Sequence, residues 1–323
     1  MSGTPRGRRA LVWVVQLLIA AIVAWFAAAT LSDQWGAFRL RATTVHPRWG
    51  GIAGSGLLVL ATYALLVQSW RTLVQAWGDQ LGFVDAARIW SVSNLGRYVP
   101  GKLWSIGAMG LLAQRAGVSP VAAAGSAVVG LVVNLAAGFV VLFVAGTDVV
   151  RALVPGVGRA AIVLPALGLA GLVATPLLLP PLTRIAARLS KRDLPAVHVP
   201  ARTLAIVVAA NVASWIGYGV GFRWLAAALV PAAAGDWLGY VAVFAGSYLA
   251  GYLALVVPGG LGVREAFMVA GLRALGLADA PTAALLAMAS RLWLTVLELL
   301  PGLVFLARGT ARPVSRPTPD APV

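Results

Sequence analysis

The chain alternates long apolar runs with short clusters of basic residues. Six runs of 20 residues or more contain no Asp, Glu, Lys or Arg: 10–31, 50–70, 116–147, 160–183, 203–222 and 237–263. A helix needs about 20 mainly apolar residues to cross about 30 Å of hydrocarbon. A seventh run, 281–307, is interrupted only by Arg291 and Glu298. The pattern predicts a bundle of transmembrane helices.

The positions of Lys and Arg predict the orientation, because cytoplasmic loops carry an excess of these residues. A cytoplasmic N-terminus gives the best agreement. The tail residues Arg308, Arg312 and Arg316 would lie outside after seven spans and inside after eight, and 262–278 is the candidate for the additional crossing. We therefore predict an all-α polytopic membrane protein of about eight transmembrane helices (seven to nine), with one or two re-entrant or broken helical segments and a cytoplasmic C-terminus.

Three regions follow from this pattern. Residues 1–9 form a basic cytoplasmic N-terminus, 10–307 a single transmembrane domain, and 308–323 a disordered basic tail. Basic residues precede the run 10–31, as in a signal peptide. Its 22 residues exceed the 7 to 15 apolar residues of a cleavable signal, so we interpret it as a membrane anchor.

Composition excludes several classes of function. The chain is 60% hydrophobic and 11% charged, with a formal net charge of +15, and its basic residues are scattered rather than gathered in a nucleic-acid-binding stripe. It has no Cys, and its two histidines, His46 and His198, are far apart, which disfavours a metal site. Gly101 and Lys102 are followed by Leu rather than Ser or Thr, so no Walker sequence is present. We expect no metal, no cofactor, no nucleic acid and no nucleotide hydrolysis.

The first interrupted segment lies between the apolar stretches 83–92 and 103–113. Pro100 and Gly101 are expected to break the helix there. The flanks are too short to span a bilayer but long enough for a re-entrant hairpin that lines a polar cavity. The alternative is a cytoplasmic surface loop whose cations bind lipid headgroups. The candidate headgroup-binding residues of this segment are Asn94, Arg97, Tyr98, Lys102 and Trp104.

The second interrupted segment is a Pro- and Gly-rich break followed at once by an acid–base pair. A helix that opens near Gly262 would place free amides and its positive dipole end beside Glu265 or a bound phosphate. The alternative is an ordinary tight turn capped by a first-turn Glu. The structural breaks are Pro258, Gly259, Gly260 and Gly262, and the candidate binding residues are Arg264 and Glu265.

Arg291 and Glu298 lie inside the last apolar run, where a charge costs about 2.5–3.5 kcal/mol even on lenient insertion scales. Seven residues apart, they share a helix face but are too distant to pair with each other. We predict Glu265 as the partner of Arg291, a further candidate binding residue, and Arg97 or Arg264 as the partner of Glu298. Alternatively, Glu298 snorkels to the membrane interface.

These two motifs together resemble the lysylphosphatidylglycerol synthase transmembrane-region family. The residues that carry the resemblance are Asn94, Arg97, Tyr98, Pro100, Gly101, Trp104, Pro258, Gly259, Gly260, Gly262, Glu265 and Arg291. The resemblance implies a flippase-like bundle with re-entrant elements that moves a lipid headgroup between leaflets. The soluble aminoacyl-transferase domain of the best-known members is absent here, so transfer of lysine from tRNA is not expected.

The leading functional hypothesis is a translocase for a phospholipid or a polyprenyl-phosphate-linked headgroup in a bacterial cytoplasmic membrane. An anionic headgroup would be compensated by Arg97 and Lys102 from the first segment and by Arg264 and Arg291 from the second. Two alternatives are a membrane-embedded enzyme that acts on lipid-linked sugars or phosphates, and a non-catalytic scaffold for a lipid-modifying enzyme. The expected partners are an anionic lipid and either a second copy of the chain or a lipid-modifying enzyme.

Overall fold

A computed structural model describes residues 47–98, 103–153, 199–230, 236–254 and 262–308, together with residues 166, 170 and 260. All regular structure in these residues is helical. The elements are α2 (Trp49–Ala76), α3 (Phe83–Asn94), the 3-10 helix η1 (Leu95–Tyr98), α4 (Leu103–Arg115), α5 (Pro120–Leu153), α7 (Ala201–Leu229), α8 (Trp237–Leu253), α9 (Val263–Ala274) and α10 (Ala280–Ala307).

The predicted all-α polytopic membrane fold is confirmed. Four described helices are long and apolar enough to cross a membrane: Trp49–Ala76, Pro120–Gly146, Ala201–Leu229 and Ala280–Ala307. The apolar helix α8 is shorter, with 17 residues. The predicted spans 10–31 and 160–183, the basic N-terminus 1–9 and most of the predicted tail 308–323 lie outside the described residues.

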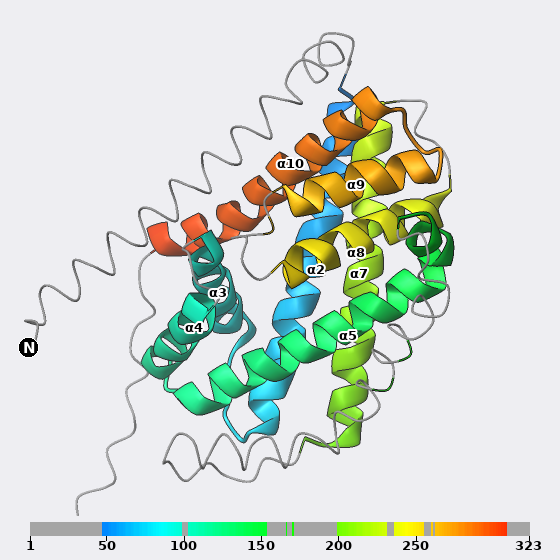
Figure 1. Cartoon of the computed structure of the whole chain (residues 1–323). Helices are drawn as coiled ribbons and strands as arrows, with labels where there is room; N and C mark the ends of the chain where they lie inside the picture. Colours follow the sequence, from blue (N-terminus) through cyan, green and yellow to red (C-terminus); the bar gives the residue numbers. More distant parts are fainter. Residues whose placement is uncertain are drawn as a thin grey trace, which may run out of the picture.

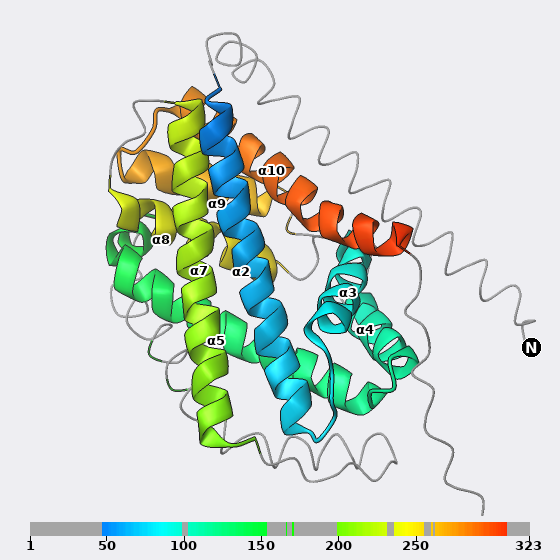
Figure 2. The same ribbon diagram turned by 180° about the vertical axis from the view of Figure 1, so that it is seen from behind.

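Helices α2 and α7 lie side by side and run in opposite directions (Figures 1 and 2). Arg48, just before α2, donates its backbone N–H to the Ala228 carbonyl near the end of α7. Further along, a Cβ on Gly217 would lie 2.6 Å from Thr62 Oγ1. The helices therefore approach through small residues, as expected when packing in lipid rather than the hydrophobic effect drives association.

A second layer of helices crosses this pair. Helices α5, α8, α9 and α10 lie in front of α2 and α7 in Figure 1 and behind them in Figure 2. An amide network joins the layers: Asn134 of α5 donates to Asn211 Oδ1 at 2.9 Å, and Asn211 donates to Ser69 Oγ at 3.1 Å. Both amides are thereby satisfied by neighbouring helices, which is their usual role inside a membrane bundle.

Helices α3 and α4 form a hairpin that begins and ends near the C-terminal end of α2. Asp79, in the turn after α2, accepts a hydrogen bond at 3.1 Å from the N–H of Ser119, after α4. The 12 and 13 residues of the two helices correspond to about 18 and 20 Å, which is too short to cross a bilayer. The predicted break between the two apolar flanks is confirmed.

Helices α8 and α9 form a second antiparallel hairpin. Near its open end, a Cβ on Gly239 would lie 3.1 Å from Leu275 Cδ1, and near its tip a Cβ on Gly251 would lie 3.0 Å from Arg264 Cβ. Two of the predicted break residues are described. Gly260 has φ +63° and Gly262 has φ +79°, both in the left-handed region. The chain thus enters and leaves this hairpin on one side of the bundle.

The hairpin changes how two predicted spans are interpreted. The run 237–263 is not one helix, because α8 ends at Leu253. The candidate crossing 262–278 contains only the 12-residue α9, about 18 Å long, so it does not cross the bilayer by itself. Pro258 and three glycines divide this apolar sequence into two arms.

The two hairpins enter the bundle from opposite ends. The α3–α4 hairpin begins beside the C-terminal end of α2, whereas α8 follows the end of α7 that lies against the start of α2. Both meet α10: Glu265 of α9 pairs with Arg291, and a Cβ on Gly302 would lie 2.9 Å from Leu95 Cδ2. Helix α10 therefore connects the two interrupted segments (Figure 1).

Tyr240 offers a test of the core between the layers. It is fully buried, and its hydroxyl has no hydrogen-bond partner among the described residues. An unsatisfied buried hydroxyl costs about 1–3 kcal/mol, so Tyr240→Phe is expected to raise the free energy of unfolding by about 1 kcal/mol in a detergent unfolding experiment.

Ser55 provides the matched opposite case. Its buried hydroxyl donates to the Gly221 carbonyl at 2.6 Å, so Ser55→Ala should lower the same free energy by about 1 kcal/mol. A loss of stability in Tyr240→Phe would show that its hydroxyl has a partner.

Candidate functional site

The described part of the tip of the α8–α9 hairpin comprises Gly260, Gly262 and the first turn of α9. The Glu265 carboxylate accepts a hydrogen bond from the Gly262 N–H through Oε2 at 2.8 Å. This contact satisfies one free amide of the helix start and places a negative charge at the positive end of the helix dipole. The capping role considered for Glu265 is thus confirmed, and it occupies only one carboxylate oxygen.

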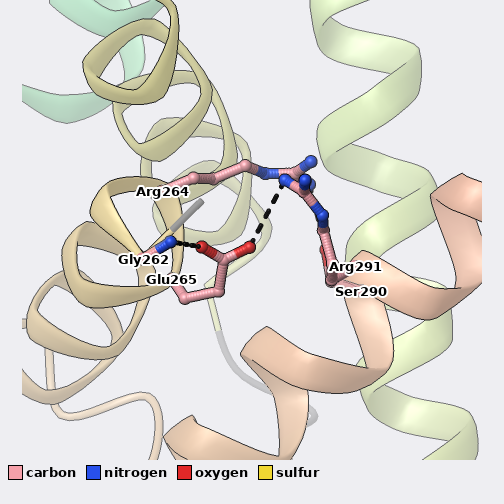
Figure 3. A network of polar contacts seen from close by, with 5 residues as sticks. All are labelled: Gly262, Arg264, Glu265, Ser290 and Arg291. Atoms are coloured by element: carbon pink, nitrogen blue, oxygen red, sulfur yellow. Dashed lines mark hydrogen bonds and ion pairs between the residues drawn. The ribbon is translucent and has the colours of Figure 1, made fainter. Parts of the chain in front are cut away.

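The other oxygen of Glu265 faces Arg291 of α10. Oε1 lies 3.5 Å from Arg291 Nη1, and the two side chains are 13% and 24% exposed (Figure 3). The predicted Glu265–Arg291 pairing is therefore confirmed. Because one carboxylate both caps α9 and pairs with α10, it fixes the start of α9 against α10.

Arg264 is the most buried charge among the described residues, with 7% of its surface exposed. It donates from Nη2 to Ser290 Oγ at 3.2 Å. Its Cζ lies 4.8 Å from the ring centre of Tyr248 and 5.4 Å from that of Phe244. A desolvated cation over an aromatic face gains about 2 kcal/mol, which offsets part of the cost of burial.

Two positive charges and one negative charge thus meet at the hairpin tip. Figure 3 shows the side chains of Arg264 and Arg291 pointing toward one another, with Glu265 below them. We call Arg264, Glu265 and Arg291 the charge cluster. Glu265 neutralises one arginine, so the cluster itself has one positive charge in excess. A second anion brought to this point would be attracted by both guanidinium groups.

Glu298 lies seven residues beyond Arg291, about 10 Å further along α10. It is half-buried and lines a pocket of about 150 Å³ together with Asn94 of α3. The hydrogen-bond partner of Arg264 is Ser290 and not Glu298. The predicted pairing of Glu298 with Arg97 stays a prediction, because the Arg97 side chain lies outside the described residues.

The remaining candidates of the first segment are described only in part. Asn94 ends α3, η1 contains Arg97 and Tyr98, and Trp104 lies in the first turn of α4. The side chains of Arg97, Tyr98 and Trp104 lie outside the described residues, as do Pro100, Gly101 and Lys102 in full. Pro258 and Gly259 also lie outside them. The structure thus places Asn94 and Glu298 around the same pocket, and it brings Arg264, Glu265 and Arg291 together.

Three residues of the site were not predicted. Ser290 receives the hydrogen bond of Arg264, and Phe244 and Tyr248 stack on each other with ring centres 5.9 Å apart. The two aromatic residues are four positions apart on α8, so they share one helix face. That spacing within the apolar helix α8 was the available signal, but an aromatic pair in a membrane helix is equally typical of lipid contact.

Gly260 is expected to be essential for the position of the tip. A Cβ there would lie 2.6 Å from the Cα of Gly251, and its φ of +63° is a left-handed conformation that costs other residues about 1–2 kcal/mol. Gly260→Ala should therefore lower the free energy of unfolding by more than about 2 kcal/mol.

Gly276→Ala is the matched control for this experiment. Gly276 has nearly the same φ, +64°, but nothing lies within 4 Å of the position of its Cβ, so only the conformational cost of about 1–2 kcal/mol applies. Equal losses in the two variants, measured by thermal unfolding in detergent, would contradict the close approach of Gly251 and Gly260.

The fold and the site define a polytopic membrane protein in which two broken helical hairpins meet a charged transmembrane helix. The sequence profile of the family described as lysylphosphatidylglycerol synthase TM region matches residues 13–302. The chain belongs to this family. The match includes both interrupted segments and the charge cluster, and it places the protein in a lipid-related family of membrane proteins. No match is found among curated proteins.

Proposed function

We propose that the protein is a flippase-like translocase that moves an anionic lipid headgroup across the cytoplasmic membrane of a bacterium. The observation that carries this proposal is the excess positive charge of the cluster at the tip of a broken hairpin. A buried charge without a partner is costly, so a site with two cations and one carboxylate favours occupation by an anion. A phosphate offers several oxygens that two guanidinium groups can bind at once.

The opposed hairpins support movement between leaflets. In many transporters, interrupted helices in the two halves of the chain surround the substrate site. Here the hairpins begin at opposite ends of the bundle and both contact α10, so each leads from one membrane surface to the same helix. The headgroup would pass along α10 while its tails stay in lipid. Arg97 and Lys102 of the first hairpin would supply further cations on that path.

The hairpin also agrees with cytoplasmic termini. The α8–α9 hairpin returns to the side from which it entered, so it adds no net crossing of the membrane. Helix α10 therefore starts on the side where α7 ends. If 10–31 and 160–183 both span, the number of crossings is even, which supports a basic tail on the same side as a cytoplasmic N-terminus. Translocation would be downhill or coupled to an ion gradient.

Reconstitution tests the proposal. The purified full chain is placed in liposomes that contain phosphatidylglycerol with a fluorescent acyl chain, and the membrane-impermeant reductant dithionite is then added. Protein-free vesicles should lose about half of the fluorescence, and vesicles with the protein should lose nearly all of it. A polyprenyl phosphate probe in a parallel experiment identifies the lipid class.

Other outcomes would identify the rival functions. Chemical conversion of the lipid would indicate an enzyme. Unchanged protection of the inner leaflet with both probes, in a protein that unfolds cooperatively, would contradict the translocase and favour a scaffold.

A further inference from the structure

Arg88 of α3 is a cation for which the proposed transport site gives no role. Its Nε is fully shielded and has no hydrogen-bond partner, and no carboxylate pairs with the guanidinium among the described residues. Its Cζ lies 5.9 Å from the ring centre of Phe305 on α10, at the outer limit of a cation–π contact. The residue as a whole is half-buried, so Arg88 is a partly exposed cation with no anion beside it among the described residues, which is uncommon in a membrane-spanning protein.

Phe305 is also one wall of the pocket that Glu298 and Asn94 line. We call this pocket, between α2, α3 and α10, the α3 groove. Most of its lining is apolar, including Leu60, Val67, Phe83, Trp90 and Phe305. Its volume of about 150 Å³ equals that of an apolar protein cavity able to take up a benzene molecule. The groove can therefore hold a short stretch of hydrocarbon, and the rest of a lipid chain would lie along the surface.

The two ends of the groove differ in chemistry. Arg88 follows Ala87, a lining residue, and stands over Phe305. Asn94 and Glu298 lie at the other end, since Asn94 is six residues beyond Arg88 on α3, about 9 Å along the axis, and Glu298 is seven residues before Phe305 on α10, about 10 Å along the axis. An anion at Arg88 would thus be separated from the Glu298 carboxylate by the apolar part of the groove.

Arg88 is also close to an end of the bundle. Its neighbours Ala86 and Ile89 pack with Trp70 and Val74, which belong to the last two turns of α2. Arginine side chains near the end of a span extend toward the lipid headgroups. A phosphate in that headgroup layer could reach Arg88 while a chain from the same lipid lies in the groove.

We propose that the α3 groove is a binding site for an anionic phospholipid, with an acyl chain between α2, α3 and α10 and the phosphate on Arg88. The occupant is lipid because the groove belongs to a membrane-spanning protein, combines an apolar body with one unpaired cation at its rim, and is near the headgroup layer. This site is separate from the charge cluster and does not depend on transport.

Photolabelling tests the site with the full chain in vesicles. The probe is phosphatidylglycerol with a diazirine in one acyl chain, and mass spectrometry locates the labelled peptides. Labels are expected in the peptides that contain Phe83, Trp90 and Phe305. Arg88→Gln should lower this labelling about tenfold, and phosphatidylcholine with the same diazirine chain should label the groove weakly in both proteins.

Two matched variants separate the site from general effects. Ala61 and Ala64 are both exposed on α2, but only Ala64 lines the groove. Ala64→Trp should abolish groove labelling, and Ala61→Trp should leave it unchanged. Arg115→Gln, at the exposed end of the other hairpin arm, should also leave it unchanged.

Three outcomes would overturn the proposal. Labels distributed evenly over the lipid-facing helices would show that no groove site exists. Groove labelling that persists in Ala64→Trp would also show that the lipid chain does not lie in the groove. Equal labelling by the two phospholipids, unaffected by Arg88→Gln, would show that Arg88 does not bind the phosphate. If Arg88→Gln unfolds the protein, Ala64→Trp and the comparison of the two lipids still decide the result.

Discussion

Arg264→Gln is expected to slow phosphatidylglycerol translocation about tenfold to a hundredfold. Arg264 is almost completely buried, and its guanidinium points toward Arg291, so it can bind an anion in the absence of competing water. A hydrogen bond to a charged group contributes about 1.5–3 kcal/mol, and each 1.4 kcal/mol corresponds to a factor of ten. Dithionite reduction of fluorescent phosphatidylglycerol in liposomes measures the rate.

Arg264→Lys is the conservative control. Lysine keeps the charge but loses the planar group that lies over Tyr248 and donates to Ser290. Its rate should lie between those of the wild type and Arg264→Gln. A normal rate in Arg264→Gln, with unchanged thermal unfolding, would exclude Arg264 from the transport path.

Glu265→Gln is expected to lower the free energy of unfolding by about 3 kcal/mol. The amide can still accept a hydrogen bond from Gly262, but the ion pair with Arg291 at 3.5 Å is lost in a mostly buried environment, and breaking a buried pair costs about 3–5 kcal/mol. The partial exposure of Arg291 places the expected loss at the lower end of this range. Unfolding in detergent with increasing denaturant measures this loss of free energy.

The double variant Glu265→Gln/Arg291→Gln should recover most of this loss, because both charges are removed together. Arg291→Gln alone should also be destabilised, since it leaves the Glu265 carboxylate unpaired. Additive losses in the double variant would contradict an ion pair between hairpin and span. They would show instead that each side chain stabilises the protein through separate contacts.

The two breaks could be predicted from the sequence because their signals are local. Pro100, Gly101 and the Pro–Gly-rich stretch near Gly260 interrupt apolar sequence, and a helix cannot continue through such residues without loss of hydrogen bonds. The pairing of Glu265 with Arg291 was predictable for a different reason. Few charges occur inside the apolar runs, so each has few candidate partners.

What the sequence could not show was the direction of the second hairpin. A crossing at 262–278 was predicted to bring the basic tail inside, but α9 is short and folds back along α8. Charge counts locate a tail on one side or the other without distinguishing a full crossing from a hairpin. The hairpin depends on contacts between residues far apart in the sequence, such as Gly239 with Leu275.

The aromatic environment of Arg264 could not be predicted from the sequence either. Phe244 and Tyr248 belong to an apolar helix in which every residue is compatible with lipid contact. Only the antiparallel packing of α8 and α9 turns that face toward Arg264. The position of Arg88 beside Phe305 depends in the same way on the packing of α10 against α3.

The ratio of translocation rates for phosphatidylglycerol and zwitterionic phosphatidylcholine tests the role of the charge cluster most directly. The ratio should exceed one in the wild type and stay so in Glu265→Gln/Arg291→Gln, which keeps one positive charge in excess. It should fall to about one in Arg264→Gln, where the excess is removed. A ratio that is the same in all three proteins would contradict selection of the anionic headgroup by the cluster.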